Sequence, residues 1–110
     1  KITGAQIEGL FNHAAGMTNG VLQVSKSFKY IIDSNSEIKE LRLNGKPIER
    51  EKTYWVASTN FVTLGGDGYW EFTESIEYED TNIFIVDVVE DYLKDKPRYS
   101  PAYDERIIIE

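Results

Sequence analysis

The spacing of apolar residues changes near residue 20, and this change limits the folds that the chain can adopt. Before it, four apolar side chains recur at helical spacing: Ile7, Leu10, Phe11 and Ala14. Thr3 and Gln6 have the spacing of a capping box, which predicts that a helix begins there, and Gly16 is its expected C-cap. After residue 20 the runs are short and rich in strand-forming residues: 21–24, 28–32, 38–43 and 53–58. Within this stretch Asn44-Gly45 is a strong hairpin signal.

The helical spacing returns in the last third of the chain. The residues that carry it are Ile85, Val88, Val89, Tyr92 and Leu93. We expect this second helix to begin near Asp80-Thr81 and to end before Pro97, with Ile107-Ile108-Ile109 as a terminal strand. A helix, an antiparallel-rich strand meander, a second helix and a terminal strand predict the α+β class. The chain has 110 residues and no linker-like segment, so residues 1–110 are expected to form a single domain.

The charge of the chain is negative and unevenly distributed. The formal net charge is −7; residues 1–69 hold eight Lys/Arg and seven Asp/Glu, whereas residues 70–110 hold four and twelve. This balance disfavours a nucleic acid or an anionic membrane surface as the partner. The longest apolar runs are also far shorter than the roughly 18–20 residues that span a bilayer. We therefore expect no nucleic-acid partner and no membrane span.

The chain has no cysteine and one histidine, His13. These counts exclude a thiol nucleophile, a thiolate metal site, a disulfide framework and a His-rich metal centre built from this chain alone. His13 lies two residues after Phe11, off the centre of the apolar stripe, and is predicted to be a surface residue or one whose polar atoms are satisfied, rather than an acid or base. No metal and no catalytic residue are therefore expected here.

The segment Gly65-Gly66-Asp67-Gly68 has three glycines in four residues. Glycines allow backbone angles with positive φ and a close approach of a ligand to the main chain. A carboxylate held among them, that of Asp67, can bind both hydroxyls of a diol such as a ribose. The segment lacks the Lys-Ser/Thr of a phosphate-binding P-loop. An ordinary tight turn is the alternative interpretation.

Aromatic residues lie on both sides of this glycine segment. Phe61, six residues before Asp67, has a ring that could stack on a planar base, or it could be a core residue at a strand end. The pairs Tyr54-Trp55 and Tyr69-Trp70 could bind a carbohydrate, but neighbours in a strand point to opposite faces and make no continuous platform. We expect Trp55 to pack in the core.

Four segments occur in an order that resembles a known family: Leu22-Gln23-Val24-Ser25, Leu43-Asn44-Gly45-Lys46-Pro47-Ile48, Lys52-Thr53-Tyr54-Trp55-Val56-Ala57 and Asn60-Phe61-Val62-Thr63-Leu64-Gly65-Gly66-Asp67-Gly68-Tyr69. Together they resemble the C-terminal domain of the 5′-nucleotidase family. This family of secreted and periplasmic metallophosphatases includes UDP-sugar hydrolases and 2′,3′-cyclic phosphodiesterases. The resemblance extends from the first residues to about Tyr69 and, more loosely, through the second helix.

The resemblance implies a role in substrate recognition. In the family, a separate N-terminal metallophosphatase domain binds a pair of divalent metal ions and hydrolyses the phosphate ester, whereas the C-terminal domain binds the nucleoside. Phe61 matches one of two rings that stack on the base, and Asp67 matches the carboxylate that binds the ribose. Asn60, Gly65 and Gly66 belong to the same motif and are expected to bind substrate. Asn19 stands where the family often has a glycine near the base. The resemblance also places the protein in the periplasm, on the cell surface or outside the cell.

The chain also departs from the family pattern. In the family, the first stacking aromatic and the substrate-binding arginines precede the opening helix, whereas this chain begins at that helix. We therefore expect a partial domain that is not catalytic alone, with the metallophosphatase domain on the same or a separate chain. The alternative is a non-catalytic ligand- or protein-binding module that uses the same fold.

Overall fold

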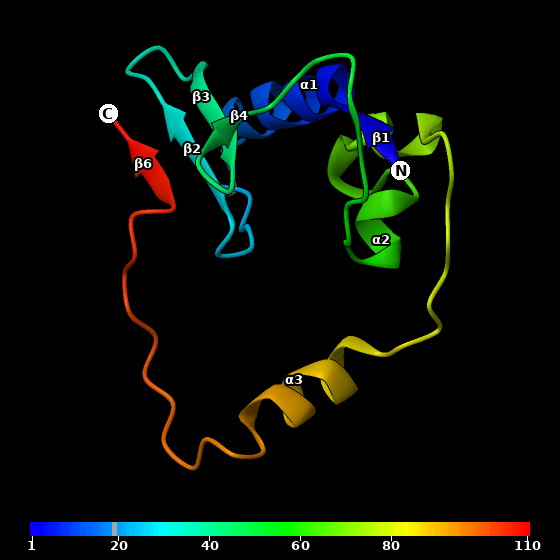
Figure 1. The fold of residues 1–110 in the computed structure, drawn as a ribbon, viewed down its shortest axis with the longest axis vertical. Helices are drawn as coiled ribbons and strands as arrows, with labels where there is room; N and C mark the ends of the chain where they lie inside the picture. The colour runs from blue at the N-terminus through cyan, green and yellow to red at the C-terminus, as the bar shows by residue number, and fades with distance from the viewer. Residues whose placement is uncertain (19) are drawn as a thin grey trace.

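The computed structural model describes residues 1–18 and 20–110, and Asn19 lies outside the described residues. The sheets and most of the helices form a body, from which a long arm carries one helix away (Figure 1). The elements, in chain order, are β1 Ile2–Thr3, α1 Gly4–Ala15, β2 Phe28–Ile32, β3 Ile38–Leu43, β4 Lys46–Pro47, β5 Thr53–Tyr54, α2 Asn60–Thr63, the 3-10 helices η1 Gly66–Gly68 and η2 Trp70–Glu74, α3 Ile85–Leu93 and β6 Ile107–Ile109. The predicted α+β class is confirmed.

Helix α1 begins as the capping box predicts. The Gln6 backbone N–H donates to Thr3 Oγ1 over 3.1 Å, and the Thr3 N–H donates to Gln6 Oε1 over 2.8 Å. The helix ends at Ala15, with Gly16 as its cap. Gly4 at its first turn donates to the Lys52 carbonyl over 2.8 Å, which ties the helix to the segment before β5.

The main sheet has the strand order β4-β3-β2-β6, and β1 pairs with β5 in a separate two-stranded sheet. β2 and β3 are antiparallel, whereas β6 returns from the far end of the chain to pair with β2 in parallel. Helix α1 packs its apolar face on this sheet, where Phe11 stacks on Phe28 with ring centroids 4.9 Å apart. The core side chains are Ile2, Ile7, Leu10, Phe11, Ala14, Tyr30, Ile32, Leu41, Tyr69 and Phe72.

Two predicted strands are wrong in whole or in part. Residues 21–24 form no strand, because their carbonyls accept from side chains instead: that of Leu22 from the Tyr30 hydroxyl over 2.7 Å, and that of Val24 from the Arg106 guanidinium over 2.9 Å. The strand predicted at 53–58 ends at Tyr54, since its partner β1 has only two residues before α1 begins.

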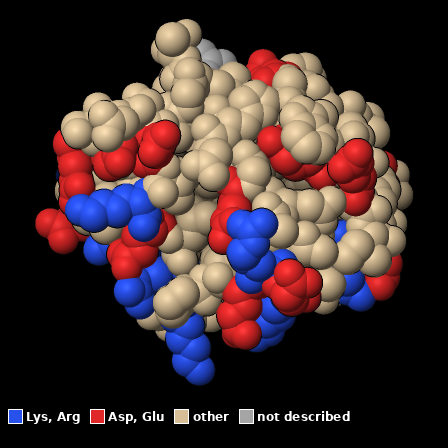
Figure 2. Space-filling model, turned by 90° about the horizontal axis from the view of Figure 1, so that it is seen from above, with Lys and Arg blue, Asp and Glu red and all other residues tan. Residues whose placement is uncertain are grey.

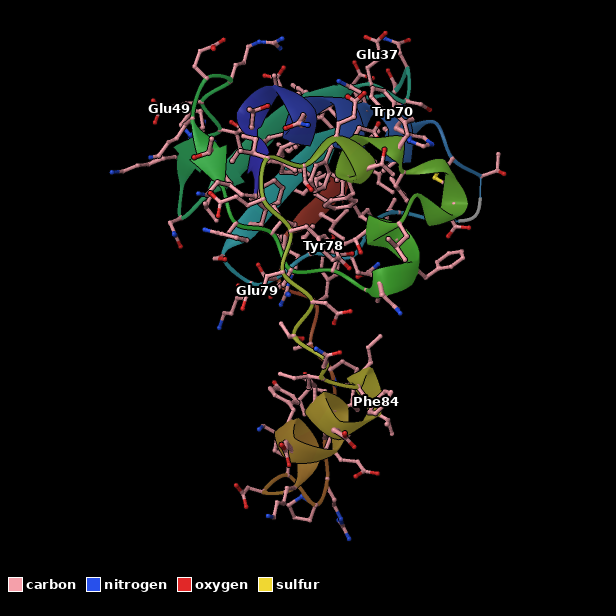
Figure 3. All side chains as sticks on the ribbon, turned by 90° about the vertical axis from the view of Figure 1, so that its right-hand side faces the viewer. Glu37, Glu49, Trp70, Tyr78, Glu79 and Phe84 are labelled. Atoms are coloured by element: carbon pink, nitrogen blue, oxygen red, sulfur yellow. The ribbon has the colours of Figure 1, made fainter. Side chains whose placement is uncertain are left out.

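The second helix begins later than predicted, at Ile85 rather than near Asp80-Thr81. The Asp80 carboxylate accepts from the Asn82 N–H over 2.8 Å, so these polar residues form a turn instead of a helix cap. The arm, residues 77–106, holds α3 away from the body (Figures 1 and 3). The apolar side chains of α3 are all exposed: Ile85, Val86, Val88, Val89, Tyr92 and Leu93. Among the described residues, no helix is long and apolar enough to cross a membrane.

Charged side chains of both signs lie next to one another on the face shown in Figure 2. Several are paired across the fold, such as Arg50 with Glu8 and Lys39 with Glu110. Exposed pairs of this kind contribute little to stability. The surface charges on this face therefore form no broad patch of one sign that would attract a polyanion.

Candidate functional site

The glycine segment follows a short helix that the sequence did not predict. Thr59 caps α2 by accepting from the Val62 N–H over 3.3 Å, and the Leu64 N–H donates to the Asn60 carbonyl over 3.0 Å. Gly65 then reverses the chain with φ of 93°, a left-handed conformation that favours glycine. The capping residue Thr59 is the signal in the sequence that could have revealed this helix.

Phe61 lies directly against the glycine segment. A Cβ atom built on Gly66 would be 2.5 Å from the Phe61 carbonyl oxygen and 2.6 Å from its ring atom Cε1. Only glycine fits at this position without a shift of the backbone. The side chain of Phe61 is nevertheless 60% exposed. The interpretation of Phe61 as a core residue is therefore wrong, and its ring is available to a ligand.

Asp67 follows in a strained, exposed position. It is a non-glycine residue with φ of 55°, and it lies between Gly66 and Gly68 in η1. The turn is closed by the Gly68 N–H, which donates to the Gly65 carbonyl over 3.2 Å, and by the Tyr69 N–H, which donates to the Gly66 carbonyl over the same distance. Gly66 thus precedes an exposed carboxylate in the chain and lies against an exposed aromatic ring.

Asn60 has a local role. Its side-chain Oδ1 accepts from the Phe61 N–H over 3.0 Å, and its carbonyl accepts from the Thr63 hydroxyl over 3.2 Å. Asn60 is exposed at the start of α2, and these two hydrogen bonds hold the first turn of the helix, which carries Phe61. A direct contact of Asn60 with a ligand stays a prediction.

Three side chains beneath the loop were not predicted from the sequence as a group: His13, Tyr69 and Glu71. His13 is half-buried, and its ring centroid is 4.9 Å from that of Tyr69. Glu71 is only 3% exposed, and its Oε1 lies 3.4 Å from His13 Nδ1. Burial raises the pKa of the Tyr69 hydroxyl, and the charges of Asp67 and Glu71 raise it further. The Tyr69 hydroxyl is therefore close enough to the Asp67 and Glu71 carboxylates to be affected by their negative charges.

The aromatic pairs form no continuous platform. Tyr69 is buried while its neighbour Trp70 is exposed. Trp55 is 59% exposed, so the prediction that it packs in the core is wrong. Because β5 ends at Tyr54, Trp55 follows the strand and lies under the Lys1 ammonium, whose Nζ is 5.2 Å from the ring centroid.

A cavity of about 770 Å³ separates the body from the arm. Residues 55–60 of the body and 77–86 of the arm contribute to its lining, with Phe84 on the arm side (Figure 3). Asn60 borders this space, whereas Phe61 and Asp67 do not. The ring and carboxylate of the candidate site are thus on the body's own surface. In residues 1–18 and 20–110, no group of three or more His, Cys, Asp or Glu side chains is placed to hold a metal ion.

This architecture, an α+β domain with a glycine loop packed over its first helix, corresponds to a known protein family. Residues 1–74 match the family described as 5′-nucleotidase, C-terminal domain. The match covers more than half of the chain, and the chain therefore belongs to this family. The motifs in the sequence predicted this membership.

Individual relatives agree with this assignment. The chain is 29% identical over 76 residues to Protein UshA of Yersinia enterocolitica, an alignment that covers 64% of this chain and 14% of that protein. It is 28% identical over 123 residues to the snake venom 5′-nucleotidase of Naja atra, covering 98% and 23%. The crystal structure of the 5′-nucleotidase precursor from Thermus thermophilus superposes with a TM-score of 0.84 at 27% identity, covering 98% of this chain and 24% of that one. The chain spans less than a quarter of the length of these relatives.

Proposed function

We propose that this chain recognises the nucleoside part of the substrate of a 5′-nucleotidase-like phosphoester hydrolase. In this proposal the ring of Phe61 stacks on the base, and Asp67 accepts hydrogen bonds from the ribose hydroxyls. Gly65 and Gly66 contact the substrate as part of the same loop. The observation that carries the proposal is the exposed Phe61 ring seated on Gly66, one residue from the exposed carboxylate of Asp67.

The chemistry of the two groups suits an uncharged nucleoside. Stacking of a base on an aromatic ring contributes roughly 1–3 kcal/mol and does not depend strongly on which base is bound. A hydrogen bond to a charged acceptor contributes about 1.5–3 kcal/mol. Residues 1–69 have a formal charge of only +1, so this part of the chain has little net positive charge to attract a phosphate. The phosphate would be bound elsewhere.

The rest of the reaction is assigned to another part of the protein. We infer that a separate metallophosphatase domain, on the same or a second chain, carries a pair of divalent metal ions and hydrolyses the phosphate ester. The similarity to Protein UshA and to snake venom 5′-nucleotidase, of which this chain covers 14% and 23%, supports this division. We also propose a location in the periplasm, on the cell surface or outside the cell, and the similarity to a venom protein supports the last of these.

Adenosine binding to the full-length protein tests the proposal. Phe61→Ala should weaken binding roughly 5- to 150-fold through the lost stacking energy. Asp67→Asn should weaken it about tenfold or more, and asparagine tolerates the left-handed backbone at this position. Phe84→Ala and Asp87→Asn are matched controls, since both residues are exposed on the arm, and they should stay within twofold of the wild type.

Mapping by two-dimensional NMR locates the ligand. Adenosine should shift the backbone amides of Gly65, Gly66 and Gly68 and those near Phe61, whereas glucose should not. Equal affinities of the wild type and Phe61→Ala would contradict the stacking. Absence of any response to adenosine or AMP would contradict nucleoside recognition altogether and favour a non-catalytic ligand- or protein-binding module.

A further inference from the structure

Glu71 is the most unusual side chain under the glycine loop. Among the described residues it is the one charged side chain that is buried. Its Oε2 has no hydrogen-bond partner among them, and its Oε1 faces His13 Nδ1 at 3.4 Å. A buried carboxylate without compensation is costly, so it persists only where its surroundings hold it for a reason. The other buried residue of η2 is the apolar Phe72, so Glu71 places a carboxylate in an otherwise apolar buried face of this helix.

The imidazole of His13 connects Glu71 to the ribose-binding loop. Its Nδ1 faces the carboxylate. Its opposite edge faces Gly68, where an added Cβ would be 3.4 Å from His13 Cε1 and 3.6 Å from Nε2. Gly68 directly follows Asp67. The imidazole is therefore a spacer between the buried Glu71 carboxylate and the main chain next to Asp67, the residue proposed to bind the ribose.

Both ends of this spacer are anchored. His13 lies in the last turn of α1, whose start is fixed by the capping box. The η2 helix that carries Glu71 is tied back to α1 by Gln6 Nε2, which donates to the Glu74 carbonyl over 2.8 Å. Gly9 of α1 faces Glu71, because a Cβ built on Gly9 would be 3.8 Å from Glu71 Cγ, an ordinary contact distance. The loop above is closed by turn hydrogen bonds and packs on Phe61 through Gly66, whereas Asp67 itself is exposed and in a strained conformation.

We propose that Glu71 and His13 are positioning residues that hold Asp67 in place for the ribose diol, and so determine the preference for a ribonucleoside over a nucleoside without ribose hydroxyls. This inference rests on the proposed function of Asp67. Loss of the pair would leave Phe61 and its stacking on the base intact, since Phe61 is seated on Gly66 and not on His13. Small displacements of a hydrogen-bonding group cost much of its contribution. The pair should therefore affect the ribose and not the base.

The test compares adenosine with 2′,3′-dideoxyadenosine in the full-length protein. The ratio of their dissociation constants isolates the ribose hydroxyls, because both compounds carry the same base. We expect the wild type to prefer adenosine about tenfold or more, and Asp67→Asn to remove this preference. Glu71→Gln should reduce the ratio at least threefold while leaving the affinity for the dideoxynucleoside within twofold. Glu74→Gln, the same change at an exposed position of η2, should keep the wild-type ratio.

Each other outcome overturns a defined part of the inference. A wild type that binds both nucleosides equally would refute the role of Asp67 and, with it, the positioning role. If Asp67→Asn loses the preference for adenosine but Glu71→Gln keeps it, the positioning role alone is refuted. An equal loss of affinity for both nucleosides would show that Glu71 is only structural. If thermal denaturation shows that Glu71→Gln does not fold, His13→Ala decides in the same way, because it removes the spacer from a half-buried position.

Discussion

Replacement of Gly66 by alanine tests the contact on which the candidate site depends. The new methyl carbon would be 2.5 Å from the Phe61 carbonyl oxygen and 2.6 and 2.7 Å from two ring carbons of Phe61. Real Cβ atoms essentially never approach another heavy atom closer than 3.0 Å. One side of the contact must therefore move by about 0.5 Å or more. The carbonyl belongs to α2 and cannot rotate away as a side chain can, so the strain passes into the helix.

The expected cost is that of an overpacked site, about 1–3 kcal/mol. For a domain of this size each kcal/mol lowers the melting temperature by roughly 4–8 °C, so Gly66→Ala should melt about 4–24 °C lower. The displaced ring should also weaken adenosine binding. Gly9→Ala is the matched control: its Cβ would be 3.8 Å from Glu71 Cγ, an ordinary contact, and alanine is favoured in a helix by about 0.5–1 kcal/mol.

Thermal denaturation and adenosine titration of both variants provide the measurement. Gly9→Ala should melt at or above the wild-type temperature, and Gly66→Ala clearly below it. If Gly66→Ala melts within about 2 °C of the wild type, less than the shift expected for 1 kcal/mol, and binds adenosine unchanged, the Phe61 ring is not seated on Gly66. The geometric basis of the proposed site would then be lost.

Three further perturbations test the fold. Burial raises the pKa of Tyr30 to about 12, so its neutral form stabilises the fold fully below about pH 10, and this stability is lost as the pH rises to about 12. Tyr30→Phe loses the hydrogen bond to the Leu22 carbonyl and should lower the free energy of unfolding by about 1 kcal/mol at pH 8. In denaturant titrations the stability of this variant should decline less steeply than that of the wild type between about pH 10 and 12. Gly4→Ala should destabilise by about 3 kcal/mol or more, since its Cβ would be 2.7 Å from the Glu49 carbonyl carbon, and a wild-type melting temperature would contradict this contact. Val88→Lys on the exposed face of α3 should reduce the binding of a hydrophobic dye and the self-association measured by sedimentation. It should change the free energy of unfolding by less than about 0.5 kcal/mol, and a larger loss would mean that α3 packs against the rest of the protein.

Local signals in the sequence predicted α1 correctly because its start, its apolar face and its end all agree. Thr3 and Gln6 form the predicted capping box, and the apolar stripe faces the sheet. The hairpin at Asn44-Gly45 likewise forms, with both residues at positive φ. These features depend on neighbours within a few residues, which is why spacing alone reveals them.

The errors arise where a segment depends on distant partners. Residues 21–24 have strand-forming side chains, but the groups that satisfy their carbonyls, Tyr30 and Arg106, are not visible as a pattern. The exposure of Trp55 follows from the length of β1, which no property of residues 53–58 encodes. Asp80 is typical of a helix cap, but it caps a turn here.

In the candidate site, too, local motifs are visible in the sequence, whereas contacts between distant residues are not. The motif predicts Phe61 and Asp67 as site residues, and the structure adds that Gly66, which precedes Asp67, packs against Phe61. The His13–Glu71 pair was not predicted, because it brings together residues 58 positions apart on two different helices. A single histidine on a helix flank has no sequence feature that reveals the acid it faces. Only the packing of η2 on α1 provides that information.

The parallel pairing of β6 with β2 has a consequence for synthesis of the protein. Tyr30 pairs with Ile107, so the fourth strand of the sheet is translated long after the strand it joins. At 5–20 residues per second, the ribosome needs roughly 4–15 s to cover this interval. During that time one edge of β2 is exposed, and such an edge can pair with other chains. The nascent protein is therefore most open to misassembly before β6 emerges, and co-translational chaperones would have their greatest effect in this interval.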